Sequence, residues 1–363
     1  MAKTTKAQKA ATVADVAREA KVSKAQAARA LGGYGAVSDD VHSRVTRAAE
    51  QLGYRPNMVA RTMNTGRSQS IGVVVGDIEN PFFGLAMRGI ADEARIAGYN
   101  VVLLNSSESH ATEVEAVSVL LDQRVDGLIL AASLSPDIQH LNDFVDSGRP
   151  IVLLDRGVEG LDVDLVRAEV EQAAFEATTL LLQAGHTRIA FVSTIRSRPS
   201  ESGTETDLGL TPVAQRLAGI RRAFVRENVP FDNALITLNA RENGSVGESV
   251  RALLTGPNRA TALIASDSVI AQEALEEIHA LDLAMPDDLS FIMFDDFAWA
   301  RLVTPPITVV AQPIYELGAT AARTLFARLR SEEPEPAPSF EATLILRDSV
   351  APPNRELAAD TVH

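Results

Sequence analysis

The 363-residue sequence contains no cysteine, which excludes a disulfide framework and thiolate chemistry. It also lacks the run of about 18 apolar residues that a membrane-spanning helix requires. The first residues, MAKTTKAQKAATVADVAREA, are basic, but they lack the apolar core of a secretory signal. These absences predict a cytoplasmic protein with no membrane partner.

Sequence patterns that accompany catalysis are also missing. The six histidines show no ligand spacing such as His-x-x-x-His, no phosphate-binding glycine loop follows the first apolar run, and no Gly-x-Ser-x-Gly motif occurs. Asp295 and Asp296 end an apolar run, where two carboxylates could hold a metal or perform acid–base chemistry, but no metal-ligand cluster accompanies them. We therefore expect a protein that is not an enzyme and that uses neither a cofactor nor a metal.

Charge is distributed unevenly along the chain, although the formal net charge is −14. Residues 1–70 contain 12 Lys+Arg and 5 Asp+Glu, a balance of +7, and the remainder contains 22 and 43, a balance of −21. This asymmetry predicts a basic nucleic-acid-binding domain attached to an acidic body. A solvated basic tail is the alternative, and it suits Lys3, Lys6 and Lys9 better than the periodic segment after them.

Residues 12–52 carry the start signals of three short helices. TVAD at 12–15 and SKAQ at 23–26 are capping-box patterns, and Ser38 precedes two aspartates at a third helix start. Only AKV separates the first two helices, as in a helix-turn-helix. Lys21 occupies this turn, where a left-handed backbone costs a non-glycine residue about 1 kcal/mol.

From residue 70 onward, apolar runs rich in Val, Ile and Leu alternate with helical stretches. Such runs predict parallel strands covered on both faces, and their two successive sets predict two tandem, doubly wound α/β lobes. The polar stretch at 195–212 is long for a connection between such elements. The expected strands are 70–77, 100–106, 127–133 and 150–156 in the first set, then 188–194, 234–240, 262–268, 289–296 and 306–313 in the second.

Four features carry a resemblance to one family: the segments TVADVAREAKVS, RVTRAAEQLGYRPNMVARTM and FDDFAWARLVTPPITVVAQP, and the rhythm of the two lobes. The chain resembles, over essentially its whole length, the LacI/GalR (lactose-repressor-like) transcriptional regulators. The resemblance implies an all-α helix-turn-helix headpiece, a hinge helix, and two α/β lobes like those of sugar-binding periplasmic proteins.

The expected domain boundaries follow from this organisation. They are 1–56 for the DNA-binding headpiece, 57–69 for the hinge helix and linker, 70–350 for the effector-binding and dimerisation domain, and 351–363 for a tail. Within that domain, the first lobe is expected at about 70–165 plus 297–330, and the second at about 166–296 plus 331–350.

The segment YRPNMVARTM at 54–63 is too short to be stable as an isolated helix. We expect it to form only when DNA and a second copy of the chain support it. The resemblance places Asn57 and Arg61 at polar positions that meet the DNA backbone or the groove floor. It places Met63 where an apolar side chain opens the minor groove and kinks the DNA. A plain linker with incidental charges is the alternative.

The second expected helix, SKAQAARAL, is identified with the helix that enters the major groove. If Val22, Ala27 and Leu31 face the core, the first residues of this helix face outward, where Arg or Lys pairs with guanine and Gln with adenine. The chain has QAAR where the family commonly has Thr-Val-Ser-Arg, so Arg29 carries over best. The predicted DNA-contacting residues of the headpiece are Thr12, Ser23, Lys24, Ala25, Gln26 and Arg29.

Parallel doubly wound sheets bind ligands at the carboxyl ends of their strands, so we expect an effector cleft between the two lobes. Phe82 and Phe83 follow the first expected strand, and the matching residues form an apolar wall in the family; helix core is the alternative. Arg156 follows Asp155 after the fourth strand and suits the recognition of hydroxyls or carboxylates. A structural ion pair between the lobes is the alternative for these two residues.

Four ligand candidates lie in the second half of the chain. Arg216, in QRLAG, matches an arginine that lines the cleft in the family. Asp267 and Asp295 each follow an expected strand, where a carboxylate accepts hydrogen bonds from adjacent sugar hydroxyls. Trp299 can stack its indole on a sugar ring. The alternatives are a helix N-cap for Asp295 and packing at the hinge for Trp299.

Together these features predict a ligand-responsive regulator that binds a near-palindromic DNA operator as a homodimer, or as a dimer of dimers. The expected effector is a small sugar or sugar derivative whose binding releases the DNA. A regulator that responds to a purine or nucleoside is the first alternative. A sugar-binding transport protein is the second, and the headpiece argues against it.

Overall fold

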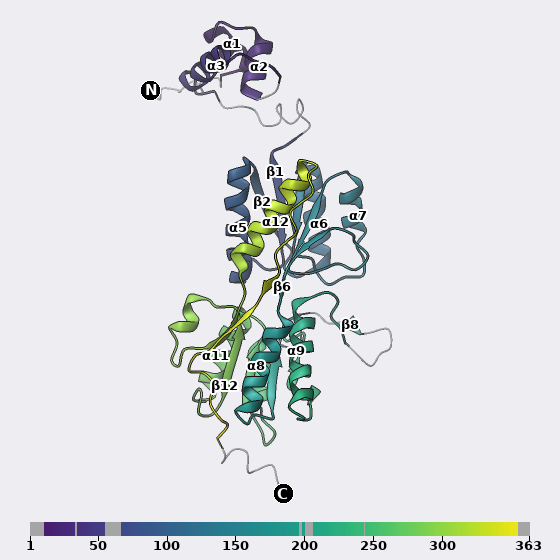
Figure 1. Cartoon of the computed structure of the whole chain (residues 1–363), viewed down its shortest axis with the longest axis vertical. Helices are drawn as coiled ribbons and strands as arrows, with labels where there is room; N and C mark the ends of the chain where they lie inside the picture. Colours follow the sequence, from purple (N-terminus) through teal and green to yellow (C-terminus); the bar gives the residue numbers. More distant parts are fainter. Residues whose placement is uncertain are drawn as a thin grey trace, which may run out of the picture. The chain divides into compact units, whose positions relative to one another are not determined.

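The computed structural model describes residues 11–32, 35–54, 67–195, 198–199, 206–242 and 244–354. The chain divides into two compact units, of which one contains the N-terminal helices and the other contains two α/β lobes (Figure 1). Among the described residues, no helix is long and apolar enough to cross a membrane.

The N-terminal unit contains three helices, α1 (Val13–Glu19), α2 (Lys24–Gly32) and α3 (Asp39–Gln51). Small apolar residues on their inner faces form one core, which includes Val16, Ala27 and Val45. Lys21, in the turn between α1 and α2, has a φ of 53°, so the expected left-handed conformation is confirmed. Small core residues allow the three short helices to approach one another closely.

The first lobe is built on a five-stranded sheet in the order β2-β1-β3-β4-β5, whose recorded strand pairs are parallel. Its strands are β1 (Ser70–Val75), β2 (Asn100–Asn105), β3 (Gly127–Leu130), β4 (Ile151–Leu154) and β5 (Asp164–Val166). Its helices are α5 (Pro81–Ala97), α6 (His110–Asp122), α7 (Gln139–Asp146) and α12 (Ile314–Leu329).

The second lobe is built on a six-stranded sheet in the order β10-β7-β11-β12-β13-β15, in which only the β15 pairing is antiparallel. Its strands are β7 (Ile189–Val192), β10 (Ile236–Thr237), β11 (Ala262–Ala265), β12 (Ser290–Phe294), β13 (Thr308–Ala311) and β15 (Thr343–Ile345). Its helices are α8 (Glu171–Gln183), α9 (Pro212–Arg226), α10 (Val246–Leu254) and α11 (Ser268–Ala280), with the 3-10 helices η1 (Asn233–Leu235) and η2 (Ala298–Arg301). A short pair, β8 (Arg198–Pro199) and β9 (Thr206–Asp207), precedes α9.

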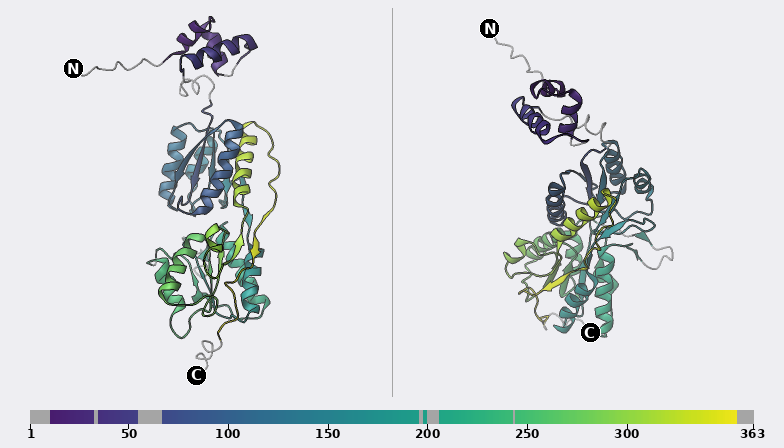
Figure 2. Two further views of the ribbon diagram at one scale, coloured as in Figure 1. Left: turned by 90° about the vertical axis from the view of Figure 1, so that its left-hand side faces the viewer. Right: turned by 45° about the horizontal axis from the view of Figure 1, so that its top comes forward.

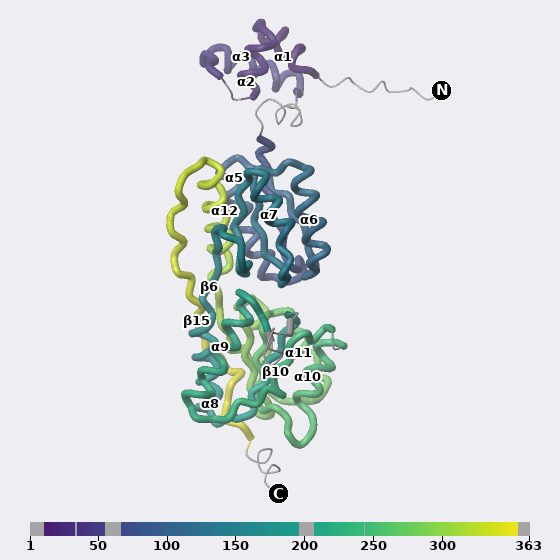
Figure 3. The backbone as a smooth tube through the Cα atoms, turned by 90° about the vertical axis from the view of Figure 1, so that its right-hand side faces the viewer, coloured from purple at the N-terminus to yellow at the C-terminus, as the bar shows by residue number. Residues whose placement is uncertain are grey.

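Helices cover both faces of each sheet. Successive residues of a strand point to opposite faces, so strands that are apolar throughout need a covering layer on each face. In the first lobe, Ile71 and Val73 share a core with α5 and α12, whereas the backbone of Gly72 lies against Leu120 of α6. In the second lobe, Phe191 belongs to the core with α8 and α9, and Val192 belongs to the core with α10 and α11. In Figure 3, α8 and α9 lie on one side of this lobe and α10 and α11 on the other. The predicted fold class, a helical headpiece followed in the sequence by two doubly wound lobes, is confirmed.

The chain crosses between the two sheets three times within the described residues. It crosses after β5 through β6 (Ala168–Glu169), again between β13 and α12, and finally after α12 through β14 (Phe340–Glu341), which pairs with β6 (Figure 2). The sequence placed all of 297–330 in the first lobe. The structure differs, because η2 packs with the second core and β13 pairs with β12, so the chain reaches the first lobe only at α12.

Helices α5 and α12 pack against each other in very close contact. Gly89 of α5 lies against the backbone of Tyr315, and Gly318 of α12 lies against the backbone carbonyl of Ala86. A Cβ atom at either glycine would overlap these backbone atoms. Glycine is therefore required at both positions for this approach.

Candidate DNA-binding surface and effector cavity

The start of α2 presents an exposed polar surface on the headpiece. Lys24, Ala25, Gln26 and Arg29 are exposed, whereas Ala27 is buried in the core. The outward orientation expected from helical periodicity is therefore present. Lys24 and Arg29 give this surface two positive charges, which suits an approach to DNA phosphates.

Thr12, Ser23 and Gln26 have capping roles in the structure. Thr12 caps α1, since its hydroxyl accepts a 3.3 Å hydrogen bond from the Asp15 amide. The backbone N–H of Gln26 donates to the Ser23 hydroxyl at 3.1 Å. In return, the side-chain Oε1 of Gln26 accepts from the backbone N–H of Ser23 at 3.0 Å. A bidentate contact with adenine uses both ends of the Gln amide. Such a contact would require Gln26 to leave its cap.

The remaining predicted DNA contacts, Asn57, Arg61 and Met63, lie outside the residues that the structure describes. Their roles therefore stay predictions.

The carboxyl ends of both sheets line a cavity of about 560 Å³. Its size is typical of small-molecule sites, which span roughly 300–1,000 Å³. The first lobe contributes residues that follow β1, β2 and β4, and the second contributes residues that follow β7, β11 and β12, together with the first turns of α9. Six predicted ligand residues line it: Phe82, Phe83, Arg156, Arg216, Asp267 and Asp295.

Arg156 is held in a two-bond contact by Glu108, which follows β2. The Arg156 Nη1 and Nη2 atoms donate to the two Glu108 carboxylate oxygens at 2.5 and 2.9 Å, and Nη1 also donates to the Ala132 carbonyl at 3.4 Å. Burial lowers the pKa of Arg156, but the carboxylates of Glu108, Asp155 and Glu113 together outweigh burial and raise it, with Glu108 the strongest of the three. Glu108 and Arg156 follow strands of the same sheet, so this ion pair lies within the first lobe and is not the inter-lobe pair of the alternative. The paired guanidinium lines the cavity.

Arg216 is the buried cation of the second-lobe side of the cavity. Its guanidinium carbon lies 4.3 Å from the centre of the Phe294 ring, and its Nε atom is buried without a hydrogen-bond partner. Burial lowers the pKa of Arg216, although the nearby carboxylates of Asp295, Asp155 and Asp267 oppose this shift. A buried donor without a partner indicates a position where a ligand can supply an acceptor.

Three carboxylates interact electrostatically with this arginine: the buried Asp155 and Asp295, and the partly exposed Asp267. Burial raises the pKa of Asp295 to about 7, although Arg216 and the side chain of Gln312 lower it. Burial likewise raises the pKa values of Asp155 and Asp267, and Arg216 opposes both shifts. Because the protein interior disfavours the charged form, Asp295 can exchange its proton near neutral pH.

The two aspartates of the second lobe are positioned differently. Asp267 caps α11, because its Oδ1 accepts from the amides of Val269 and Ile270 at 2.9 and 3.0 Å. Asp295 accepts a 2.7 Å hydrogen bond from Gln312 and has a φ of 73°. The residue that precedes η2 as its cap is Phe297. The helix-cap alternative proposed for Asp295 is therefore wrong.

The aromatic candidates divide into two groups. Phe82 and Phe83 stack edge to face at 5.3 Å, line the cavity and also belong to a hydrophobic core. The core alternative is therefore present, and a contact of these rings with a ligand stays a prediction. Trp299 lies in η2, packs against the second-lobe core and is not among the described residues that line the cavity. This placement favours packing over ligand stacking for Trp299.

Several lining residues were missed from the sequence. They include Asp77, Asn105, Glu108, Arg241 and Glu242. Asp77, Asn105 and Glu108 end or follow strands, which was the available signal, whereas Arg241 and Glu242 lie in a loop without a motif. Among the residues that the structure describes, seven acidic residues and three arginines line the cavity, so the charge of this lining disfavours anionic ligands.

A helix-turn-helix unit joined to a two-lobed cavity domain defines a ligand-responsive DNA-binding protein. Residues 12–57 match the model of bacterial regulatory proteins of the lacI family, residues 68–207 match the periplasmic binding protein and sugar-binding domain of the LacI family, and residues 178–350 match a periplasmic binding protein-like domain. The chain belongs to the LacI family of transcriptional regulators.

Three relatives illustrate this membership. The catabolite control protein A of Priestia megaterium is 32% identical over 84% of this chain and 88% of its own length. The ribose operon repressor of Halalkalibacterium halodurans is 33% identical over 84% and 86%. The structure of a LacI family regulator from Enterococcus faecium with bound ribose matches with a TM-score of 0.64 at 27% identity, over 78% of this chain and 99% of that one.

Proposed function

We propose that the protein is a transcriptional repressor that binds a near-palindromic operator as a dimer in the cytoplasm and is released by a neutral sugar. The observation that carries the choice of ligand is the described part of the cavity lining, which contains seven acidic residues and three arginines. Many acceptors and few donors suit a ligand that brings several hydroxyl donors and no negative charge. The names of two relatives, a ribose operon repressor and a regulator with bound ribose, support this class of ligand.

In this proposal, Arg216 and Asp295 hold adjacent sugar hydroxyls from the second lobe. The buried Nε of Arg216 donates to a hydroxyl oxygen, and the free oxygen of Asp295 accepts from a hydroxyl group. Arg156 binds from the first lobe, and its bond to Glu108 fixes its direction. Asp267 retains its capping bonds and offers its other oxygen, while Phe82 and Phe83 cover the apolar face of the ring.

The headpiece contacts DNA in this proposal through the exposed start of α2. Lys24 and Arg29 reach phosphates or guanine edges, and Ala25 contacts a thymine methyl group. Asn57 and Arg61 contact the hinge region of the operator, and Met63 opens the minor groove. Sugar binding changes how the lobes of the two chains pair, which separates the hinge segments and lowers DNA affinity. No covalent bond is made or broken in this mechanism.

The first test identifies the operator and the ligand separately. The purified protein selects sequences from a random duplex pool, and a two-fold symmetric consensus is expected. Neutral pentoses and hexoses, phosphosugars, nucleosides and purines are then screened by thermal shift, where a ligand at about 100 times its dissociation constant stabilises by roughly 2.7 kcal/mol. A neutral sugar that shifts the melting temperature and releases the selected DNA is the expected result.

Other outcomes have defined meanings. A shift with phosphosugars alone would contradict the charge argument, and a shift with nucleosides or purines alone would replace the sugar by the alternative ligand class. Absence of a symmetric consensus would contradict binding as a dimer.

A further inference from the structure

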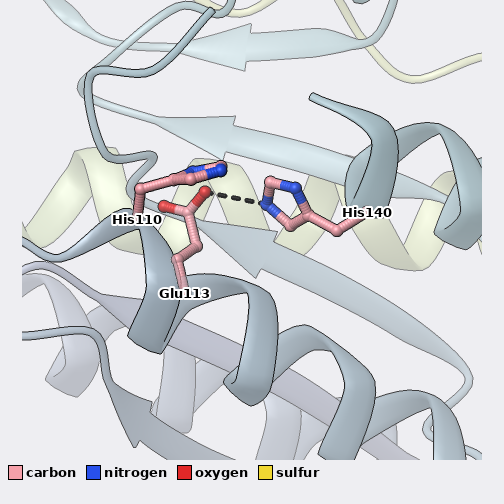
Figure 4. Close-up of side chains that lie close together, drawn as sticks. All are labelled: His110, Glu113 and His140. Carbon is pink, nitrogen blue, oxygen red and sulfur yellow. Dashed lines mark hydrogen bonds and ion pairs between the residues drawn. The ribbon is translucent and has the colours of Figure 1, made fainter. Parts of the chain in front are cut away.

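Two helices of the first lobe bring together three side chains of the kinds that bind metals. His110 is the first residue of α6, Glu113 lies one turn later on the same helix, and His140 lies in the first turn of α7 (Figure 4). One nitrogen of each histidine and one oxygen of Glu113 lie within 4.8 Å of one another. The sequence did not show this group, because its third member comes 27 residues after Glu113, on another helix.

The group is buried and its hydrogen bonding is incomplete. Glu113 is 1% exposed and the His140 side chain is 8% exposed. Glu113 Oε1 lies 2.9 Å from His140 Nε2, and Glu113 Oε2 accepts from the Ser133 amide at 2.5 Å. The Nδ1 atoms of both histidines are buried and have no hydrogen-bond partner. Buried polar atoms are normally paired, so the unpaired Nδ1 of His110 calls for a further partner. His140 faces Glu113 through Nε2, which leaves its own Nδ1 on the far side of the ring.

The donor set selects a class of ion. Two imidazoles and one carboxylate are ligands of zinc and of other divalent transition metals. Calcium and magnesium prefer oxygen ligands, and this group offers too few of them. The His110 side chain is 30% exposed, which provides a path for entry of the ion.

We propose that His110, Glu113 and His140 form a binding site for a divalent transition-metal ion, separate from the effector cavity. Donors around tetrahedral zinc lie about 3.3 Å apart, so the three side chains need only small rotations to close on the ion. The site is connected to Arg156 of the effector cavity through two neighbouring residues. Glu113 accepts a hydrogen bond from the backbone N–H of Ser133, and the carbonyl of Ala132, the preceding residue, accepts one from Arg156.

The test measures zinc binding by the full-length chain without a polyhistidine tag, after treatment with a chelator and its removal. Equilibrium dialysis with metal analysis should find one zinc ion per chain, and magnesium in excess should not displace it. His110→Ala and Glu113→Gln should each weaken zinc binding at least about tenfold, since each removes a direct ligand. The matched control is His279→Ala, which removes an exposed histidine of α11 and should leave zinc binding unchanged.

Circular dichroism without metal establishes that each variant is folded. If Glu113→Gln does not fold, His110→Ala decides, because His110 is the most exposed member of the group. The proposal fails if the wild-type chain binds no zinc at millimolar concentration, if both folded variants bind zinc like the wild type, or if His279→Ala weakens binding equally.

Discussion

At the scale of single residues, Asp295 shows how burial sets the chemistry of the cavity. The carboxyl group is 1% exposed, its pKa is about 7, and its one recorded hydrogen bond comes from Gln312. Because the ordinary value is 3.8, the folded protein retains this proton over a pH range in which the unfolded chain has lost it. The contribution of Asp295 to stability is therefore greatest at low pH and is lost as the pH rises through 7.

Asp295→Asn should remove this pH dependence. The amide cannot ionise, so the free energy of unfolding of the variant should rise relative to wild type between pH 5 and pH 8, by at most roughly 3 kcal/mol. Urea denaturation of both proteins across this range gives the difference. A difference that does not change with pH would show that Asp295 ionises at its ordinary pKa.

At the scale of elements, the contact between α5 and α12 depends on its glycines. Gly318→Ala places a methyl group against the Ala86 carbonyl, and we expect a loss of roughly 1–3 kcal/mol in the free energy of unfolding. Gly84→Ala is the matched control, because Gly84 lies exposed in α5 with no neighbouring atom around its Cβ position. Alanine should stabilise the helix there by about 0.5–1 kcal/mol.

Denaturant midpoints of the two glycine variants provide the measurement. Equal effects of the two substitutions would show that helix propensity, and not the close approach of α5 and α12, determines the outcome.

The capping box of α2 is a second feature at this scale. Ser23→Ala removes the hydroxyl that accepts from the Gln26 amide, so α2 should lose about 1 kcal/mol of stability, whereas Ser23→Gly should lose only a few tenths. Hydrogen exchange of the α2 amides in the full-length protein reports the difference. Equal exchange in wild type and Ser23→Ala would contradict a capping role.

At the scale of the whole molecule, the proposed mechanism requires reciprocal linkage of DNA and sugar. If saturating sugar weakens operator affinity by a certain factor, saturating operator must weaken sugar affinity by the same factor. Titration of the sugar with and without the selected operator measures it, and a typical coupling is about 5- to 150-fold. Random-sequence DNA of the same length is the control and should have a smaller effect. Equal sugar affinity with and without operator would exclude this mechanism.

Much of this architecture could be predicted from the sequence, because periodicity and capping patterns are local. Each of the nine expected strand segments contains a strand of the structure. The three-residue strand β5 was missed, since it is too short to show a pattern. The lobe to which each element belongs was harder to predict from the sequence. Nothing in the local sequence shows that β13 pairs with β12, while α12, which begins three residues later, packs on the other lobe.

The cavity was predicted best where a residue directly follows a strand or matches a family motif. Arg156, Arg216, Asp267 and Asp295 were found in this way, and all four line the cavity. Glu108 was missed because its role depends on a backbone turn with a φ of 55° and on a partner 48 residues away. The long-range contacts of side chains are determined by the packing of whole elements, which local patterns do not report.

The three crossings of the chain between its sheets affect how the gene can be rearranged and how the protein responds to truncation. Neither lobe is a continuous piece of the sequence, so neither can be gained, lost or exchanged by a single cut in the gene. A stop codon shortly before α12 would remove that helix from the first lobe and the edge strand β15 from the second at once. Damage near the carboxyl end of the chain therefore affects both lobes together.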